Sequence, residues 1–174
     1  CNLAPPGQFA ADLEPLGVLV EHRVDDVDEG FVAVEQAVAP REQVAAYASN
    51  PDNAPIWYVN IKSAEWQSPK PLQIGSKVAF VAYFLGRRLA YTYEFTTLDP
   101  EEKLVMRTAQ GPFPMETTYT WTSLPNGHTR MTLRNMGQPS GFSKLFAPMM
   151  ARAMRKANEK DLHNLKRILE THPA

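Results

Sequence analysis

The sequence has almost no cysteine and no long apolar run. Among its 174 residues only Cys1 is a cysteine, so no disulfide can form within the chain. A single cysteine is typical of a reducing compartment, and we expect a cytoplasmic protein. The alternative is an exported lipoprotein that carries its lipid on Cys1. No apolar stretch approaches the roughly 18 residues of a membrane-spanning helix, so we expect no integral membrane segment.

An excess of charge of either sign is also lacking. Eighteen Lys and Arg residues against 19 Asp and Glu residues give a net charge of −1, which predicts no nucleic-acid partner. The four histidines are too scattered for metal-ligand spacing, so we expect no metal. The sequence contains no Gly-rich phosphate loop and no G-x-S-x-G nucleophile motif. These absences predict that the protein uses no cofactor.

The first 29 residues differ from the rest of the chain. They begin with the turn-forming Pro5-Pro6-Gly7 and hold seven acidic side chains. We interpret residues 1–29 as an acidic N-terminal extension and residues 30–174 as the folded domain. The C-terminal region is basic, which leaves three interpretations open: docking of the extension onto it, attraction to an anionic membrane during ligand uptake, or a solvated helix face.

The apolar pattern after residue 30 predicts a sheet interrupted by two short helices. Residues 31–38 are β-rich, and Pro40 is suited to the first turn of a helix over 41–49. A second short helix is expected around 52–58. From Ile61 to Met136 the apolar period is two, which predicts strands at 61–66, 77–85, 88–98, 103–109, 115–123 and 129–136. The short turns between them, including Asn126-Gly127, predict an antiparallel meander.

The period returns to 3.6 after residue 139 and predicts one long C-terminal helix. Ser140 is a candidate N-cap, and an apolar stripe runs from Phe142 to Leu169. A helix of roughly 30 residues is about 45 Å long and can cross a whole sheet. We therefore predict an α+β fold, in which a curved antiparallel sheet of about seven strands wraps around this helix.

The order of elements resembles the helix-grip fold of the START-like superfamily, also called SRPBCC. The resemblance covers residues 31–170. It rests on the strand at 31–38 followed by Ala39-Pro40-Arg41-Glu42-Gln43-Val44, on the segment from Asn50 to Trp57, on Gly75-Ser76-Lys77-Val78, and on the last strand and helix. This superfamily includes polyketide cyclase/dehydrase and lipid-transport proteins. The resemblance implies a fold that encloses a cavity for a small molecule.

The inward faces of the predicted strands and helix suggest what lines such a cavity. Buried tyrosines and tryptophans bring polar groups that need partners, and methionines give an adaptable apolar surface. The predicted ligand-binding residues are Trp57, Tyr58, Phe80, Phe84, Tyr91, Tyr93, Met106, Phe113, Tyr119, Trp121, Asn135, Phe146, Met149, Met150 and Met154.

Two of these positions, Trp57 and Asn135, allow two interpretations each. Trp57 and Tyr58, with the loop around Phe113, are candidates for the mouth of the cavity. Trp57 is equally well explained as a hydrophobic plug that anchors the second helix. Asn135 either orients a ligand carbonyl or caps the turn at Gly137.

Candidate catalytic groups are few. If the protein is an enzyme, the acid or base is expected among Tyr91, Tyr93 and Tyr119. Glu94 and Glu116 are better bases, but strand alternation places both on the outer face. No catalytic pair emerges, so a non-enzymatic role is favoured.

Three functions remain open at this point. The first is binding or transport of a small hydrophobic ligand, such as a lipid, polyketide or aromatic metabolite. The second is a cofactor-independent polyketide cyclase or dehydratase, which the family resemblance alone supports. The third is a protein-interaction module of the co-chaperone type. The expected partner is a small hydrophobic molecule, and the expected assembly is a monomer or homodimer.

Overall fold

The structure is a computed structural model that describes residues 31–137 and 147–171. The expected acidic extension, the candidate N-cap Ser140 and the predicted ligand-binding residue Phe146 lie outside these ranges. In chain order the elements are β1 (Phe31–Ala37), α1 (Arg41–Ser49), the 3₁₀ helix η1 (Pro51–Asn53), α2 (Ala54–Trp57), β2 (Ile61–Trp66), β3 (Lys77–Phe84), β4 (Arg87–Asp99), β5 (Lys103–Gln110), β6 (Met115–Ser123), the 3₁₀ helix η2 (Pro125–Gly127), β7 (Thr129–Gly137) and α3 (Ala147–Thr171).

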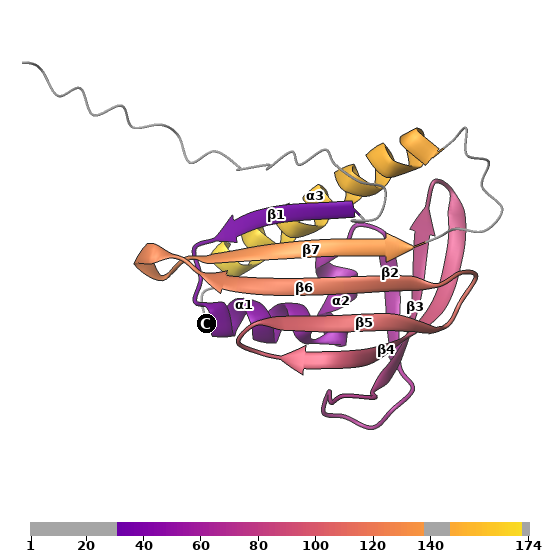
Figure 1. Ribbon diagram of the computed structural model, residues 1–174, viewed down its shortest axis with the longest axis horizontal. Helices are drawn as coiled ribbons and strands as arrows, with labels where there is room; N and C mark the ends of the chain where they lie inside the picture. Colours follow the sequence, from indigo (N-terminus) through magenta and orange to yellow (C-terminus); the bar gives the residue numbers. More distant parts are fainter. Residues whose placement is uncertain (1–30, 138–146, 172–174) are drawn as a thin grey trace, which may run out of the picture.

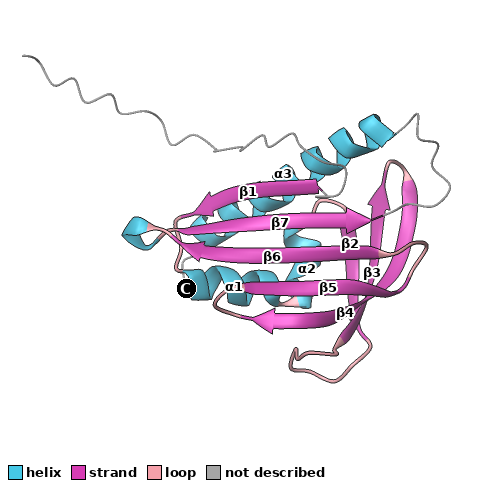
Figure 2. Ribbon diagram, in the orientation of Figure 1, coloured by secondary structure: helices cyan, strands magenta, loops and turns pink. Residues whose placement is uncertain are grey.

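Seven strands form one antiparallel sheet in the order β1-β7-β6-β5-β4-β3-β2. Strands β2 to β7 follow one another as a meander, and β1 closes the far edge against β7. The sheet is strongly curved: β2 and β3, at one end, run at a steep angle to β6 and β7 (Figure 1). The helices lie together on one side of the sheet (Figure 2). This arrangement confirms the predicted α+β helix-grip fold.

Two hairpin turns depend on residues in the left-handed region. Asn126 and Gly127 have φ of 67° and 75°, so the predicted Asn-Gly turn between β6 and β7 is confirmed. The turn between β3 and β4 lies at Leu85 (φ 48°) and Gly86 (φ 75°), one residue earlier than expected. The strands pair as far as Phe84 and Arg87, so Leu85 and Gly86 are the two residues of the turn. A two-residue hairpin of this kind requires positive φ at both of them.

The core lies between the inner face of the sheet and the helices. Alternate residues of several strands are buried, as Val78, Phe80 and Ala82 are on β3. Helix α3 packs most extensively against β1, and its buried leucines face the sheet. Burial of one apolar stripe of a helix against one apolar face of a sheet is the simplest way to give both a core.

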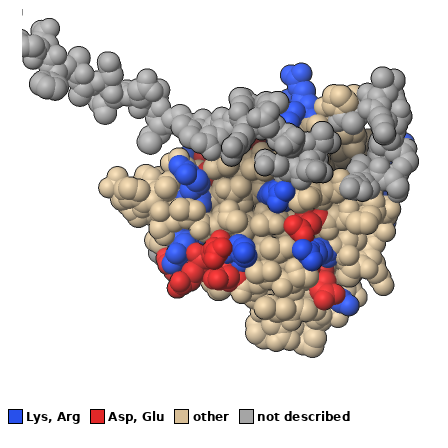
Figure 3. Space-filling view, viewed as in Figure 1, with Lys and Arg blue, Asp and Glu red and all other residues tan. Residues whose placement is uncertain are grey.

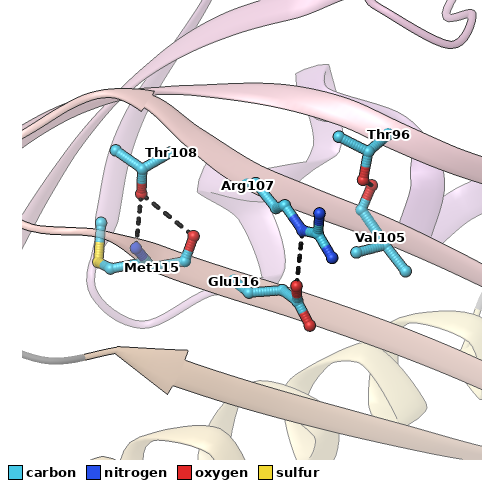
Figure 4. Close-up of polar contacts among 6 residues, drawn as sticks. All are labelled: Thr96, Val105, Arg107, Thr108, Met115 and Glu116. Carbon is cyan, nitrogen blue, oxygen red and sulfur yellow. Dashed lines mark hydrogen bonds and ion pairs between the residues drawn. The ribbon is translucent and has the colours of Figure 1, made fainter.

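The outer face of the sheet is polar. On it the Arg107 guanidinium donates to the Glu116 carboxylate across β5 and β6 (Figure 4). On the same two strands the Thr108 hydroxyl bonds both backbone groups of Met115, but Thr108 lies opposite the inward-facing Tyr93. Positive and negative side chains are mixed over the face seen in Figure 3. The outward position predicted for Glu116 agrees with this pairing.

Candidate functional site

A cavity of about 450 Å³ lies between the inner face of the sheet and the helices. Its walls come from every part of the domain: from β1, the α1–α2 region, β2 to β7 and α3. The lining is mostly aromatic, aliphatic and thioether side chains, with a few polar groups set among them. A volume of several hundred Å³ with sparse polar groups is typical of sites for small molecules.

Most of the predicted ligand-binding residues line this cavity. They are Tyr58, Phe80, Phe84, Tyr91, Tyr93, Met106, Phe113, Tyr119, Asn135, Met150 and Met154. The fold thus brings together side chains from elements that are far apart in the sequence. Their role in binding stays a prediction.

Three other predicted residues do not reach the cavity wall. Trp57 is fully buried and stacks on Tyr58, with ring centroids 3.8 Å apart, so it occupies the position of an interior plug. Trp121 is also buried and contacts Tyr119 edge to face, with ring centroids 6.4 Å apart. Met149 is 56% exposed. Periodicity assigns a residue to a face of an element but does not say how deep it lies along that element.

Two tyrosines on opposite walls are bonded to each other. The Tyr58 hydroxyl, after α2, meets the Tyr119 hydroxyl of β6 in a short hydrogen bond. Burial raises the pKa of both phenols, so both keep their protons at neutral pH. Because one hydrogen serves the bond between them, the pair retains one hydroxyl hydrogen that a ligand can accept.

A chain of hydrogen bonds, which we call the polar relay, crosses the cavity wall from β4 to β1. The Tyr93 hydroxyl lies 3.0 Å from the Thr117 hydroxyl, which is 2.6 Å from Asn135 Oδ1. Asn135 Nδ2 donates to Asn158 Oδ1 at 2.9 Å, and Asn158 Nδ2 donates to the Phe31 carbonyl at 3.0 Å. Asn135 therefore points inward, as the interpretation that it orients a ligand requires.

The sheet register explains why these side chains meet. Asn135 of β7 lies directly opposite Phe31 of β1 on one side and Thr117 of β6 on the other. Side chains at directly opposed positions project from the same face of a sheet. Tyr93 lies two strands away on β4, and its long side chain reaches over β5 to Thr117.

Asp161 of α3 is a second polar site, and sequence analysis missed it. Its side chain lines the cavity and is only 3% exposed. One carboxylate oxygen accepts the Val59 backbone N–H at 2.7 Å. Burial raises the pKa of Asp161 to about 7, although the Val59 hydrogen bond partly opposes this shift. Asp161 also raises the pKa of Tyr58, Tyr91 and Tyr119, which places these hydroxyls within its electrostatic reach.

The sequence did contain a signal for Asp161 and Asn158. Both residues fall on the apolar stripe of α3, between Met154 and Leu165, at intervals of three and four residues. A polar side chain within such a stripe is placed in the core by the helix period, where it needs a partner. The apolar residues of the stripe alone do not reveal Asn158 and Asp161 as buried polar groups.

The exposure of the lining residues indicates where the cavity opens. Leu85, at the β3–β4 turn, is 53% exposed, and Arg87 beside it is also exposed. The lining residues Phe95, Tyr119 and Asp161 are buried. The cavity therefore runs from the β3–β4 turn and the Phe113 loop towards the centre of the domain.

The sequence matches the profile of a known family over almost all of the described domain. The family is described as polyketide cyclase / dehydrase and lipid transport, and the match covers residues 31–170. The chain belongs to this polyketide cyclase/dehydrase and lipid transport family. Its helix-grip fold and its cavity are those expected of a START-like member. No curated protein matches the sequence significantly.

Solved structures share this family's fold at low sequence identity. A protein from Thermus thermophilus is 18% identical with a TM-score of 0.69, covering 82% of this chain and 98% of that one. The Zhui aromatase/cyclase from Streptomyces sp. R1128 is 13% identical with a TM-score of 0.66, covering 80% and 92%. A START superfamily protein from Mycobacterium smegmatis is 14% identical with a TM-score of 0.65, covering 80% and 96%.

Neither a membrane span nor a metal cluster is found in the described part of the chain. No described helix is both long and apolar enough to span a membrane. Within residues 31–137 and 147–171, no group of three or more His, Cys, Asp and Glu side chains converges as a metal site would require.

Proposed function

We propose that the protein binds a small, mainly apolar molecule in the cavity between the sheet and α3. A lipid, a polyketide or an aromatic metabolite has the right character. The observation that carries this proposal is the cavity itself, because about 450 Å³ of space lined by aromatic and methionine side chains would be unfavourable to leave unfilled. The family to which the chain belongs supports the same conclusion.

The polar groups of the wall supply orientation for such a ligand. The polar relay and the Tyr58–Tyr119 pair lie among apolar residues, where hydrogen bonds to a ligand are not weakened by competing water. A ligand with one or two oxygen atoms on an apolar frame matches this wall better than a hydrocarbon does. The cavity gives no support to the alternative of an interaction module of the co-chaperone type.

A cavity-filling variant tests the binding proposal. Ala82 lines the cavity on β3, so Ala82→Phe places a ring inside it. Ala90→Phe on β4 makes the same change at an exposed position and is the matched control. We expect titration calorimetry with 2-naphthol to show binding to the wild type and to Ala90→Phe, and at least tenfold weaker binding to Ala82→Phe. Equal affinity for all three proteins would contradict the proposal.

One observation favours acid–base catalysis as a second function. Asp161 has a pKa raised to about 7 by burial and lines the same cavity as Tyr58, Tyr91 and Tyr119. A carboxyl group with that pKa can donate a proton to a ligand carbonyl oxygen, or accept one from a neighbouring carbon, near neutral pH. This chemistry would suit a cyclase or dehydratase without a cofactor.

Substitution of Asp161 separates turnover from binding. With a substrate whose turnover has been demonstrated, Asp161→Asn should lower kcat by about a hundredfold or more and change KM little. Tyr93→Phe and Tyr119→Phe test the tyrosines that the sequence suggested as acid or base. A kcat that survives in Asp161→Asn would exclude this carboxyl as the acid or base.

A further inference from the structure

The polar relay has a fixed direction, and this direction sets what the cavity recognises. We infer that Tyr93 presents a hydrogen-bond acceptor to the ligand, so that the protein selects apolar molecules bearing a hydroxyl group at this point. Thr117 sets this preference as a positioning residue. The inference rests on the proposed function and specifies the chemical class of its ligand.

The direction follows from the last group of the relay. The Phe31 carbonyl can only accept, so Asn158 must donate to it through Nδ2 and turn Oδ1 towards Asn135. Asn135 must then donate through Nδ2, which leaves its Oδ1 facing Thr117. Thr117 must donate its single hydroxyl hydrogen to that oxygen. Tyr93 must therefore donate its own hydrogen to Thr117.

Tyr93 consequently has no hydrogen left for a ligand. Its oxygen can still accept a further hydrogen bond. Tyr93 and its partner Thr117 both line the cavity, which places the Tyr93 hydroxyl at the wall. Burial raises the pKa of Tyr93 to about 12, so the phenol keeps its hydrogen, and the direction of the relay, throughout the neutral range.

A ligand hydroxyl satisfies this oxygen, whereas a carbonyl or an ether oxygen does not. A carbonyl oxygen placed beside Tyr93 would face another acceptor and would lose the hydrogen bonds it made in water. A site built to bond a hydroxyl discriminates strongly against an analogue that lacks the hydrogen.

The test compares two probes of similar shape, 2-naphthol as a donor and 2-naphthaldehyde as an acceptor. We expect the wild type to bind 2-naphthol about tenfold more tightly in titration calorimetry, the effect of one hydrogen bond. In Thr117→Val the Tyr93 hydroxyl no longer donates to Thr117 and can donate to the aldehyde oxygen. The preference for 2-naphthol over 2-naphthaldehyde should then fall to about twofold or reverse. Thr117→Ser keeps the hydroxyl and should retain the wild-type preference.

Tyr93→Phe gives an independent test in case Thr117→Val does not fold. It removes the acceptor, so the affinity for 2-naphthol should fall to that for 2-naphthaldehyde. Tyr83→Phe makes the same change at a half-exposed position outside the cavity wall and should change neither affinity.

The outcomes separate the inference from the proposed function. If both probes bind the wild type with equal affinity, or if Thr117→Val leaves the preference unchanged, the inferred direction of recognition is wrong while binding stands. If neither probe binds the wild type, the proposed function fails and the inference fails with it.

Discussion

Asn158 and Asp161 lie one turn apart on α3, and both are buried in the cavity wall, yet their surroundings differ. The Asn158 amide accepts from Asn135 and donates to the Phe31 carbonyl, so both ends of a neutral group are paired. The Asp161 carboxylate accepts the Val59 N–H at one oxygen, and its pKa is raised to about 7. Asn158 is paired at both ends and cannot ionise, so its state does not change with pH. Asp161 is buried but can ionise, so its state does.

The largest effect is expected from Asn158→Asp. The new carboxylate cannot donate to the Phe31 carbonyl, and it places a charge at a position that is 1% exposed. An unpaired buried charge destabilises a protein by about 3 to 5 kcal/mol. We expect urea denaturation at about pH 8 to show a loss of that size. An unchanged unfolding midpoint would mean that the relay contributes little to stability.

The reverse exchange, Asp161→Asn, is expected to stabilise the protein. The folded-state pKa of Asp161, about 7, lies above its ordinary value of 3.8. The folded protein therefore binds this proton more tightly than the unfolded chain does. The contribution of Asp161 to wild-type stability should be most favourable below about pH 4, fall as the pH rises to 7 and then level off. The neighbouring Tyr58, Tyr91 and Tyr119 do not titrate in this window, because their pKa values are raised.

The amide in Asp161→Asn keeps an oxygen for the Val59 N–H but never ionises. We expect the variant to gain about 2 to 4 kcal/mol of unfolding free energy over the wild type at about pH 8. Below about pH 4 the gain should vanish. Urea titrations at a series of pH values measure both. A gain that did not depend on pH would show that relief of the buried charge is not its cause.

These two residues also mark the limit of what the sequence could predict. The strand alternation of β3, β4 and β6 placed Phe80, Tyr93 and Tyr119 on the inner face, and the structure agrees. Those assignments need only local periodicity. Recognising Asp161 required the additional step of treating a polar residue on an apolar stripe as informative.

Other features of the site depend on contacts between distant parts of the chain. The Tyr58–Tyr119 hydrogen bond joins residues 61 positions apart, and Val59 meets Asp161 across 102 positions. Local periodicity carries no information on such pairs. For the same reason the sequence predicts Trp57 and Trp121 as lining residues, whereas in the structure their ring neighbours Tyr58 and Tyr119 line the cavity.

A smaller effect is expected from the Tyr58–Tyr119 pair, which is neutral like the relay but joins only two groups, the buried Tyr119 and the half-buried Tyr58. Tyr58→Phe and Tyr119→Phe should each destabilise the protein by about 1 kcal/mol, as loss of one neutral hydrogen bond does. The double variant should cost less than the sum of the two, because each single change already breaks the same bond. Thermal denaturation of the four proteins measures this coupling. Additive losses would mean that the two hydroxyls act independently.

The smallest effect is expected on the outer face, from Arg107 and Glu116. Their side chains are directly opposed on β5 and β6 and lie 2.7 Å apart, but that of Arg107 is 63% exposed. Water and salt screen such a pair, and its contribution is typically below about 1 kcal/mol. A double-mutant cycle with Arg107→Gln and Glu116→Gln should give a coupling of about 0.5 kcal/mol or less that decreases in about 1 M salt. The Asn158 relay carries no full charge, so its contribution should not respond to salt. A coupling at Arg107–Glu116 as large as the loss in Asn158→Asp would mean that charge, and not burial with complete pairing, determines which polar contacts stabilise this fold.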